Sequence, residues 1–173
     1  YYFRCEFAKI NNVKVSKTLE WMVNQAWGQL KSTDERSMYI GDSRSLVGMK
    51  KGNKVAKLSH GNKDCTVISI GLYEEGASAN TISKPSQVSS ELQADTYDAP
   101  KNHEFLDGEG FVCLYGNHLI MSPAANLRAS AINGFLESLL TKSGFGSESD
   151  VMEIHQVADV DVVKTIEEEG VSN

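Results

Sequence analysis

Four histidines are the side chains of this sequence best suited to bind a metal ion or to act as general bases. Each is far from the next, and none belongs to an HExxH or HxE…CxxC pattern, the spacings that bring zinc ligands together. We therefore predict no metal site and no cofactor. The histidines are His60, His103, His118 and His155.

Motifs for nucleophilic catalysis and phosphate binding are also missing. Cys5, Cys65 and Cys113 form no CxxC pair, and their odd count is typical of reduced thiols buried in strands. No GxSxG elbow or GxxxxGK[ST] loop occurs, and Gly108-Glu109-Gly110 precedes a strand rather than a helix. The carboxylates of residues 95–109 fall in a predicted loop, which gives no paired geometry for acid–base catalysis. We predict that the chain is not an enzyme.

The feature that stands out from the rest of the sequence is a cationic stretch from Arg44 to Lys63. It contains six basic residues and no acidic one. Clustered lysine and arginine side chains bind phosphate groups through their charge and the release of counterions. The predicted nucleic-acid contacts are Arg44, Lys50, Lys51, Lys54, Lys57 and Lys63.

Three interpretations of this stretch stay open. Its lysines could contact the phosphates of nucleic acid, protect exposed sheet edges against aggregation, or face an acidic protein surface. No aromatic residue lies between Tyr39 and Tyr73, so the stretch lacks the stacking platform of single-strand binders. If it binds nucleic acid, we expect contact with the backbone of double-stranded DNA.

The charge of the chain is divided between its halves. Residues 1–85 have 13 Lys and Arg against 8 Asp and Glu, whereas residues 86–173 have 4 against 15, and the net charge is −6. The acidic half opposes binding to a polyanion. It therefore supports an alternative function in protein interaction or homo-oligomerisation.

Two helices are predicted from apolar residues that recur every three or four positions. The first runs from an N-cap at Ser16 to about Lys31. The second starts at Ser122-Pro123, with serine as the N-cap and proline at the first helical position, and runs to about Lys142, with Gly144 as a stop.

The other apolar runs alternate as strands do, and Gly52-Asn53 and Gly116-Asn117 are the predicted hairpin turns. Loops are expected at 74–84 and 95–110, with a short helix at Pro85–Ala94 between them. The pattern predicts an α+β fold, mainly an antiparallel sheet of hairpins with two main helices. The predicted strands are 2–10, 37–41, 45–50, 54–59, 66–73, 111–115 and 118–121.

The last residues are predicted to form a β–α unit, a strand at 151–157 followed by a helix that Asp159 caps. One strand and one helix cannot bury their own apolar faces. The unit therefore either packs on the main domain or begins a second domain. We predict an α+β binding domain at 1–145 and the β–α unit at 146–173.

The composition is that of a globular protein, with 173 residues of which 40% are hydrophobic. No signal-peptide pattern is present, and no apolar run approaches the roughly 20 residues of a membrane span. We expect a cytoplasmic protein without a membrane partner. The missing initiator Met suggests an excerpt of a longer chain.

The order of the elements also has a likeness to a known family, carried by five segments. They are Leu19–Asn24, Met38–Ile40, Phe111–Ile120, Phe135–Leu140 and Val151–Ile154. Over residues 17–160 this layout resembles the Rex phage-exclusion A proteins and related bacterial anti-phage defence proteins of unassigned domain families. The resemblance implies a longer, often dimeric protein that acts as a DNA-binding sensor in phage defence.

The sequence thus predicts a non-enzymatic DNA-binding or sensing module of a bacterial anti-phage defence system, with phosphate contacts from a basic hairpin. Double-stranded DNA is the expected partner. The alternative is a protein-interaction or oligomerisation module that binds a phage or host protein.

Overall fold

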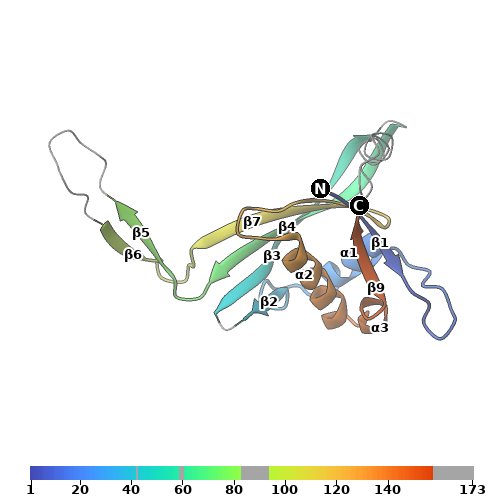
Figure 1. The fold of residues 1–173 in the computed structure, drawn as a ribbon, viewed down its shortest axis with the longest axis horizontal. Coiled ribbons are helices and arrows are strands. Elements are labelled where there is room, and N and C mark those ends of the chain that lie inside the picture. Colours follow the sequence, from blue (N-terminus) through green and yellow to red (C-terminus); the bar gives the residue numbers. More distant parts are fainter. Residues whose placement is uncertain (42, 59–60, 83–93, 158–173) are drawn as a thin grey trace, which may run out of the picture.

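Seven strands form one curled antiparallel sheet in the order β2-β3-β4-β7-β8-β1-β9 (Figure 1). This arrangement confirms the predicted α+β fold with a mainly antiparallel sheet. The computed structural model describes residues 1–41, 43–58, 61–82 and 94–157, and for 53–58, 61–64 and 82 the backbone alone. The strands of the sheet are β1 (Tyr2–Phe7), β2 (Ser37–Ile40), β3 (Arg44–Leu58), β4 (Gly61–Glu74), β7 (Leu106–Tyr115), β8 (His118–Ser122) and β9 (Met152–Gln156).

Two helices, α1 (Leu19–Gln29) and α2 (Ala129–Lys142), cover one face of the sheet (Figure 1). A short helix, α3 (Gly146–Ser149), follows α2. Both long helices bury the residues that recur every three or four positions, and each strand adds alternate residues to the same core. The largest fully buried side chains are Phe135, Leu19, Met22, Leu46, Ile68, Ile70, Leu114, Leu119, Met121, Leu127, Ile132 and Leu136.

Helix α1 begins slightly later than predicted. Thr18 rather than Ser16 is the N-cap, and its Oγ1 accepts a hydrogen bond from the backbone N–H of Trp21 at 3.3 Å. Both residue types can cap a helix, and the sequence alone did not distinguish them.

Helix α2 also begins later, at Ala129, with Arg128 in the N-cap position. The predicted start at Ser122-Pro123 was wrong because Ser122 still pairs with Phe111 in the sheet. The segment between them is a loop that inserts Leu127 into the core. Strand pairing and burial of this leucine outweigh the local capping signal.

Strands β3 and β4 form one long hairpin, so the predicted turn at Gly52-Asn53 was wrong. Strand β3 continues through both residues, which pair with Val67 and Thr66 of β4. A two-residue turn of this type needs positive φ at its central residues, and Gly52 does not adopt it. The predicted strands 45–50 and 54–59 are therefore parts of a single strand.

A second, two-stranded sheet consists of β5 (Ser78–Ile82) and β6 (Ala94–Asp98), which project away from the main body (Figure 1). We call these two strands the β5–β6 arm. The predicted loops at 74–84 and 95–110 were wrong where β5, β6 and the start of β7 lie, because these strands consist largely of small and polar residues that resemble a loop in the sequence. The predicted helix at 85–94 lies outside the described residues, apart from Ala94, which begins β6.

The predicted turn at Gly116-Asn117 is confirmed, because it joins β7 to β8 and Gly116 has a φ of +60°. The predicted strand at 151–157 is also confirmed as β9, which pairs with β1 at the edge of the main sheet. The helix expected after Asp159 lies outside the described residues. The division into 1–145 and 146–173 therefore stays a prediction.

Cys5 gives the stability of this fold a dependence on alkaline pH. Its thiol is buried in β1, and burial, with a smaller contribution from Glu6, raises its pKa from 9.0 to about 12. Between these values the unfolded chain loses the thiol proton while the folded chain keeps it, so stability falls as pH rises. The loss approaches about 1.4 kcal/mol per pH unit above 9.

A Cys5→Ala variant should show a shallower decline. Denaturant unfolding of both proteins at pH 7, 9 and 10.5 under reducing conditions gives the difference in their free energies of unfolding at each pH. Lysines and tyrosines titrate in both proteins, so their contribution drops out of this difference. Parallel stability curves would contradict the assignment to Cys5.

Candidate functional site

The structure distributes the predicted basic residues along the whole length of the β3–β4 hairpin. Arg44 opens β3 and pairs with Glu74, whereas Lys57 lies near the far end and pairs with Asn62. These two ends are roughly 40 Å apart, at about 3.3 Å per residue. The six residues therefore do not form one patch.

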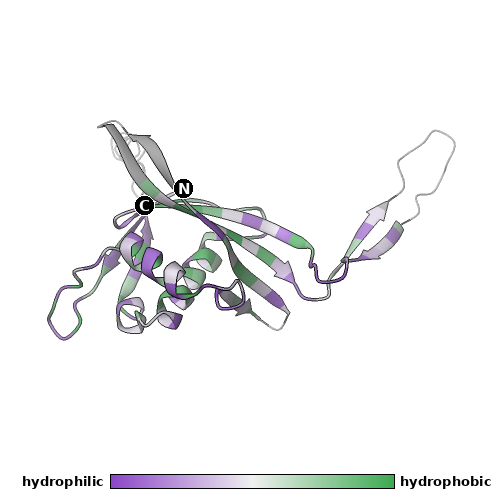
Figure 2. Ribbon diagram, turned by 180° about the vertical axis from the view of Figure 1, so that it is seen from behind, coloured by the Kyte–Doolittle hydropathy of each residue, from purple (hydrophilic) through white to green (hydrophobic). Residues whose placement is uncertain are grey.

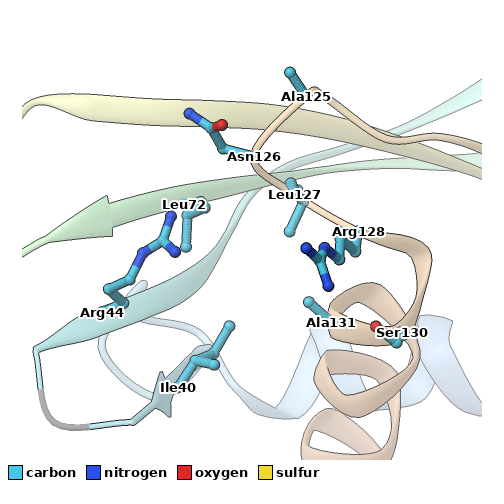
Figure 3. A pocket seen from close by; sticks show the side chains of 9 residues that line it. All are labelled: Ile40, Arg44, Leu72, Ala125, Asn126, Leu127, Arg128, Ser130 and Ala131. Atoms are coloured by element: carbon cyan, nitrogen blue, oxygen red, sulfur yellow. The ribbon is translucent and has the colours of Figure 1, made fainter.

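Arg44 belongs to a different part of the surface. Its guanidinium forms an ion pair with Asp107, with a nitrogen–oxygen distance of 2.6 Å, and both side chains are partly exposed. Arg44 and Arg128 extend from two sides toward a hollow of about 380 Å³ whose lining includes Ile40 and Leu72 (Figure 3). Because Asp107 already pairs with Arg44, we separate Arg44 from the lysines.

Lys50 and Lys51 lie on opposite faces of the sheet, as neighbouring residues of a strand do, and a β-bulge before them sets which of the two faces the helices. The register shifts between Gly48 and Lys50, so that Lys51 pairs with the buried Ile68 on the helix side. The Nζ of Lys51 donates a hydrogen bond of 2.8 Å to Oδ1 of Asn24 in α1. Lys50 is exposed on the face that the helices leave uncovered.

The far part of the hairpin is a two-stranded ribbon that extends beyond the rest of the sheet (Figure 1). Pairing of β7 with β4 ends at Thr66, and pairing of β2 with β3 is confined to the start of β3. Five further β3–β4 pairs reach roughly 17 Å past the sheet. We call residues 54–58 and 61–65 the β3–β4 arm. Its charged residues are Lys54, Lys57, Lys63 and Asp64.

The sheet face opposite α1 and α2 is covered by no helix of the described residues, and we call it the open face (Figure 2). It carries large apolar and aromatic side chains, because strands in its middle have such residues at both alternating positions. Tyr2, Phe111, Tyr115 and Ile120 are 42%, 45%, 38% and 55% exposed, respectively. This surface was missed from the sequence, where these residues were read only as members of hairpins.

Cross-strand register arranges part of the open face as a row made of Tyr115, two histidines and Arg4. Tyr115 pairs with His118, which pairs with Arg4, which in turn pairs with His155. The Tyr2 and His118 rings stack at 5.9 Å, and the Tyr2 hydroxyl shares a hydrogen bond of 2.6 Å with Nδ1 of His118. The row ends at β4 beside Cys65, the position that pairs with Lys54 of the arm.

Glu20 of α1 holds the turn that carries Tyr115 and His118. Its Oε2 accepts a hydrogen bond of 2.7 Å from the Gly116 N–H, while its Oε1 accepts from both the N–H and the hydroxyl of Thr66 at 3.2 and 3.0 Å. The backbone of α1 is tied to the same turn, since the Leu19 N–H donates to Oδ1 of Asn117 at 2.8 Å. The helix therefore fixes the end of the open face.

Cys65 and Cys113 lie side by side on β4 and β7, with their sulfur atoms 3.2 Å apart and no disulfide between them. Burial, together with hydrogen bonding to Cys65, raises the pKa of the Cys113 thiol to about 12. The neutral thiol is a poor nucleophile and a poor metal ligand.

Within the described ranges, no three His, Cys, Asp or Glu side chains come close enough to hold a metal ion. No helix in the same part of the chain is both long and apolar enough to cross a membrane.

No protein-family model, no curated protein and no solved structure matches this chain. The resemblance to phage-exclusion proteins therefore stays a prediction. A function must be inferred from the two surfaces themselves, the β3–β4 arm and the open face.

Proposed function

We propose that this chain is a non-enzymatic DNA-binding module that contacts the phosphates of double-stranded DNA through the β3–β4 arm. The observation that supports the proposal is the position of Lys54, Lys57 and Lys63 on a ribbon that extends past the sheet. The resemblance to anti-phage proteins adds the proposed setting, a bacterial defence system in the cytoplasm.

A projecting ribbon suits this task physically. The major groove of B-DNA admits a two-stranded β-ribbon, and lysines along it can reach the phosphates on either side. Lys50 lies four residues before the arm on the same strand and is exposed, so it can extend the same contact. Arg44 and Lys51 are engaged elsewhere, with Asp107 and Asn24, and are not part of the proposed contact.

Charge reversal of the arm tests this proposal. A Lys54→Glu/Lys57→Glu/Lys63→Glu variant should bind a labelled duplex of about 30 base pairs at least tenfold more weakly at low salt. Because each lost phosphate contact lowers the log–log salt slope by about 0.9, the slope should fall by up to about 2.7. Fluorescence anisotropy titrations at about 50 and 200 mM salt measure both quantities.

The matched control is Lys9→Glu/Lys31→Glu/Lys101→Glu, which changes the net charge equally on exposed residues away from the arm. It should retain most of the duplex affinity. Equal losses in the two triple variants, or no duplex binding by the parent at low salt, would rule out the arm as a DNA contact.

A second candidate function, protein interaction, is favoured by the β5–β6 arm. All five residues of β6 are exposed, Asp95 and Asp98 among them, and a two-stranded sheet without a core is marginally stable on its own. The arm projects at the opposite end of the molecule from the β3–β4 arm (Figure 1). Under this alternative, the basic arm of one copy binds the acidic arm of the next, and sedimentation shows salt-sensitive assembly without duplex binding.

A further inference from the structure

The open face has a set of exposed aromatic rings on which unpaired bases could stack, whereas the β3–β4 arm has none. We infer that this face binds an unpaired nucleic-acid strand that continues from the duplex held by the arm. The inference rests on the proposed function and narrows its substrate class to DNA with a junction between paired and unpaired segments.

The aromatic side chains are placed for base stacking. Phe111 and Tyr115 are on the same face of β7, four residues and about 13 Å apart, with Cys113 between them. Tyr2 lies across β8 from Cys113, because both it and Cys113 pair with Ile120. Rings that stand on a sheet and remain partly exposed can stack with successive bases of any sequence.

Cationic side chains surround these rings. Arg4 lies in the row with Tyr115, while Lys50 pairs with Ser69, which pairs in turn with Phe111. A polyanionic strand therefore meets positive charge on both sides of the aromatic residues.

The acidic residues of the open face lie near its margins. Glu6 pairs with Glu153 at the β1–β9 edge, and these carboxylates contact Arg4 at 3.4 Å and His155 at 3.1 Å, respectively. Glu109 lies two residues before Phe111 on the same face of β7 and pairs with Gly71, at the end of β7 away from the row that contains Tyr115. Arg4 is well exposed beside Glu6, so a phosphate can reach its guanidinium.

The geometry also gives the strand a direction. The row from His155 through Arg4, His118 and Tyr115 ends beside Cys65, which pairs with Lys54 at the base of the arm. A strand that lies along this row therefore passes onto the ribbon without crossing the helices. A duplex with a single-stranded tail fits both surfaces at once.

The test compares three labelled probes by fluorescence anisotropy: a blunt duplex, a single strand of about 15 nucleotides, and a duplex with that strand as a tail. A Phe111→Ala/Tyr115→Ala variant should bind the single strand and the tailed duplex at least tenfold more weakly, since stacking on each ring contributes substantially to affinity. It should bind the blunt duplex as the parent does.

Tyr39→Ala/Tyr97→Ala is the matched control, because it removes two exposed tyrosines that lie elsewhere, on β2 and β6. It should bind all three probes normally. Tyr115→Phe keeps the ring and should retain parental affinity. If the double alanine variant fails to fold, as judged by circular dichroism, Arg4→Glu tests the same surface and should weaken binding of the single strand.

The outcomes separate this inference from the proposed function. Unchanged single-strand binding by both open-face variants, with normal duplex binding by the parent, would refute the inference and leave the arm intact. Loss of duplex binding in the arm variant, together with weaker single-strand binding and normal duplex binding in the Phe111→Ala/Tyr115→Ala variant, would support both. If no open-face variant affects binding but assembly changes, the face is a contact between copies and the inference fails.

Discussion

Replacement of Gly48 by valine is expected to destabilise the fold strongly. A Cβ atom at this position would lie 2.8 and 3.1 Å from two carbons of the Trp27 ring and 3.0 Å from the Phe135 ring. Neither ring can easily move aside. Arg36 stacks 4.8 Å from the Trp27 ring and donates through Nε to the Gly48 carbonyl oxygen at 3.2 Å. We expect a loss of about 3 kcal/mol in the free energy of unfolding.

Gly52→Val is the control in the same strand. A Cβ atom there meets nothing within 4 Å, and valine suits an extended strand better than glycine does. This variant should keep or slightly raise stability. Urea denaturation measures the free energy of unfolding of the two variants. Equal changes would show that packing against Trp27 and Phe135 does not exclude a larger side chain at position 48.

The second large effect is expected from Glu20→Ala. Removal of the carboxylate leaves the backbone N–H groups of Thr66 and Gly116 without the oxygens that they now contact at 3.2 and 2.7 Å. Hydrogen bonds to charged groups are among the strongest in proteins, and a partly buried donor without a partner adds a desolvation penalty. The free energy of unfolding should fall by about 3 kcal/mol. The Gly116 amide should also exchange its hydrogen faster.

Gln25→Ala, an exposed change on the same helix, should alter stability by less than about 0.5 kcal/mol. The Glu20→Gln variant should lose less stability than Glu20→Ala and more than Gln25→Ala. The amide of glutamine has one acceptor oxygen, whereas the carboxylate of Glu20 uses two. If Glu20→Ala unfolds at the same urea concentration as the parent, the carboxylate does not hold the turn.

Much of the fold could be predicted from local patterns. The apolar spacing of α1 and α2 identified the faces that are buried, and the turn at Gly116-Asn117 was found because Gly116 must adopt positive φ. The turn at Gly52-Asn53 was wrong because a favourable dipeptide permits a reversal without requiring one. Continued pairing of Gly52 with Val67 satisfies the backbone of both strands instead.

The candidate site was only partly accessible from the sequence. The lysines of the β3–β4 arm could be identified as a run without acidic residues. Their separation from Arg44 depends on the strand continuing through Gly52, and the bulge before Lys50 decides that Lys51, rather than Lys50, lies on the helix side. The open face could not be anticipated, since which face the helices leave uncovered is a tertiary property. A signal for it was the presence of large apolar or aromatic residues at both alternating positions of β7 and β8, where Phe111, Tyr115 and Ile120 alternate with buried aliphatic residues.

The two arms also shape the electric field of the molecule. Among the described residues, Lys54, Lys57 and Lys63 lie on the ribbon at one end of the molecule and Asp95 and Asp98 lie on the β5–β6 arm at the other (Figure 1), so these charges contribute a dipole along the molecule. In the electric field of a polyanion, a protein with this charge distribution rotates before contact, so that its lysine-bearing end approaches first. A negative net charge of −6 thus slows approach from most directions while it leaves one orientation attractive. Steering of this kind acts on the rate of encounter, and salt weakens it.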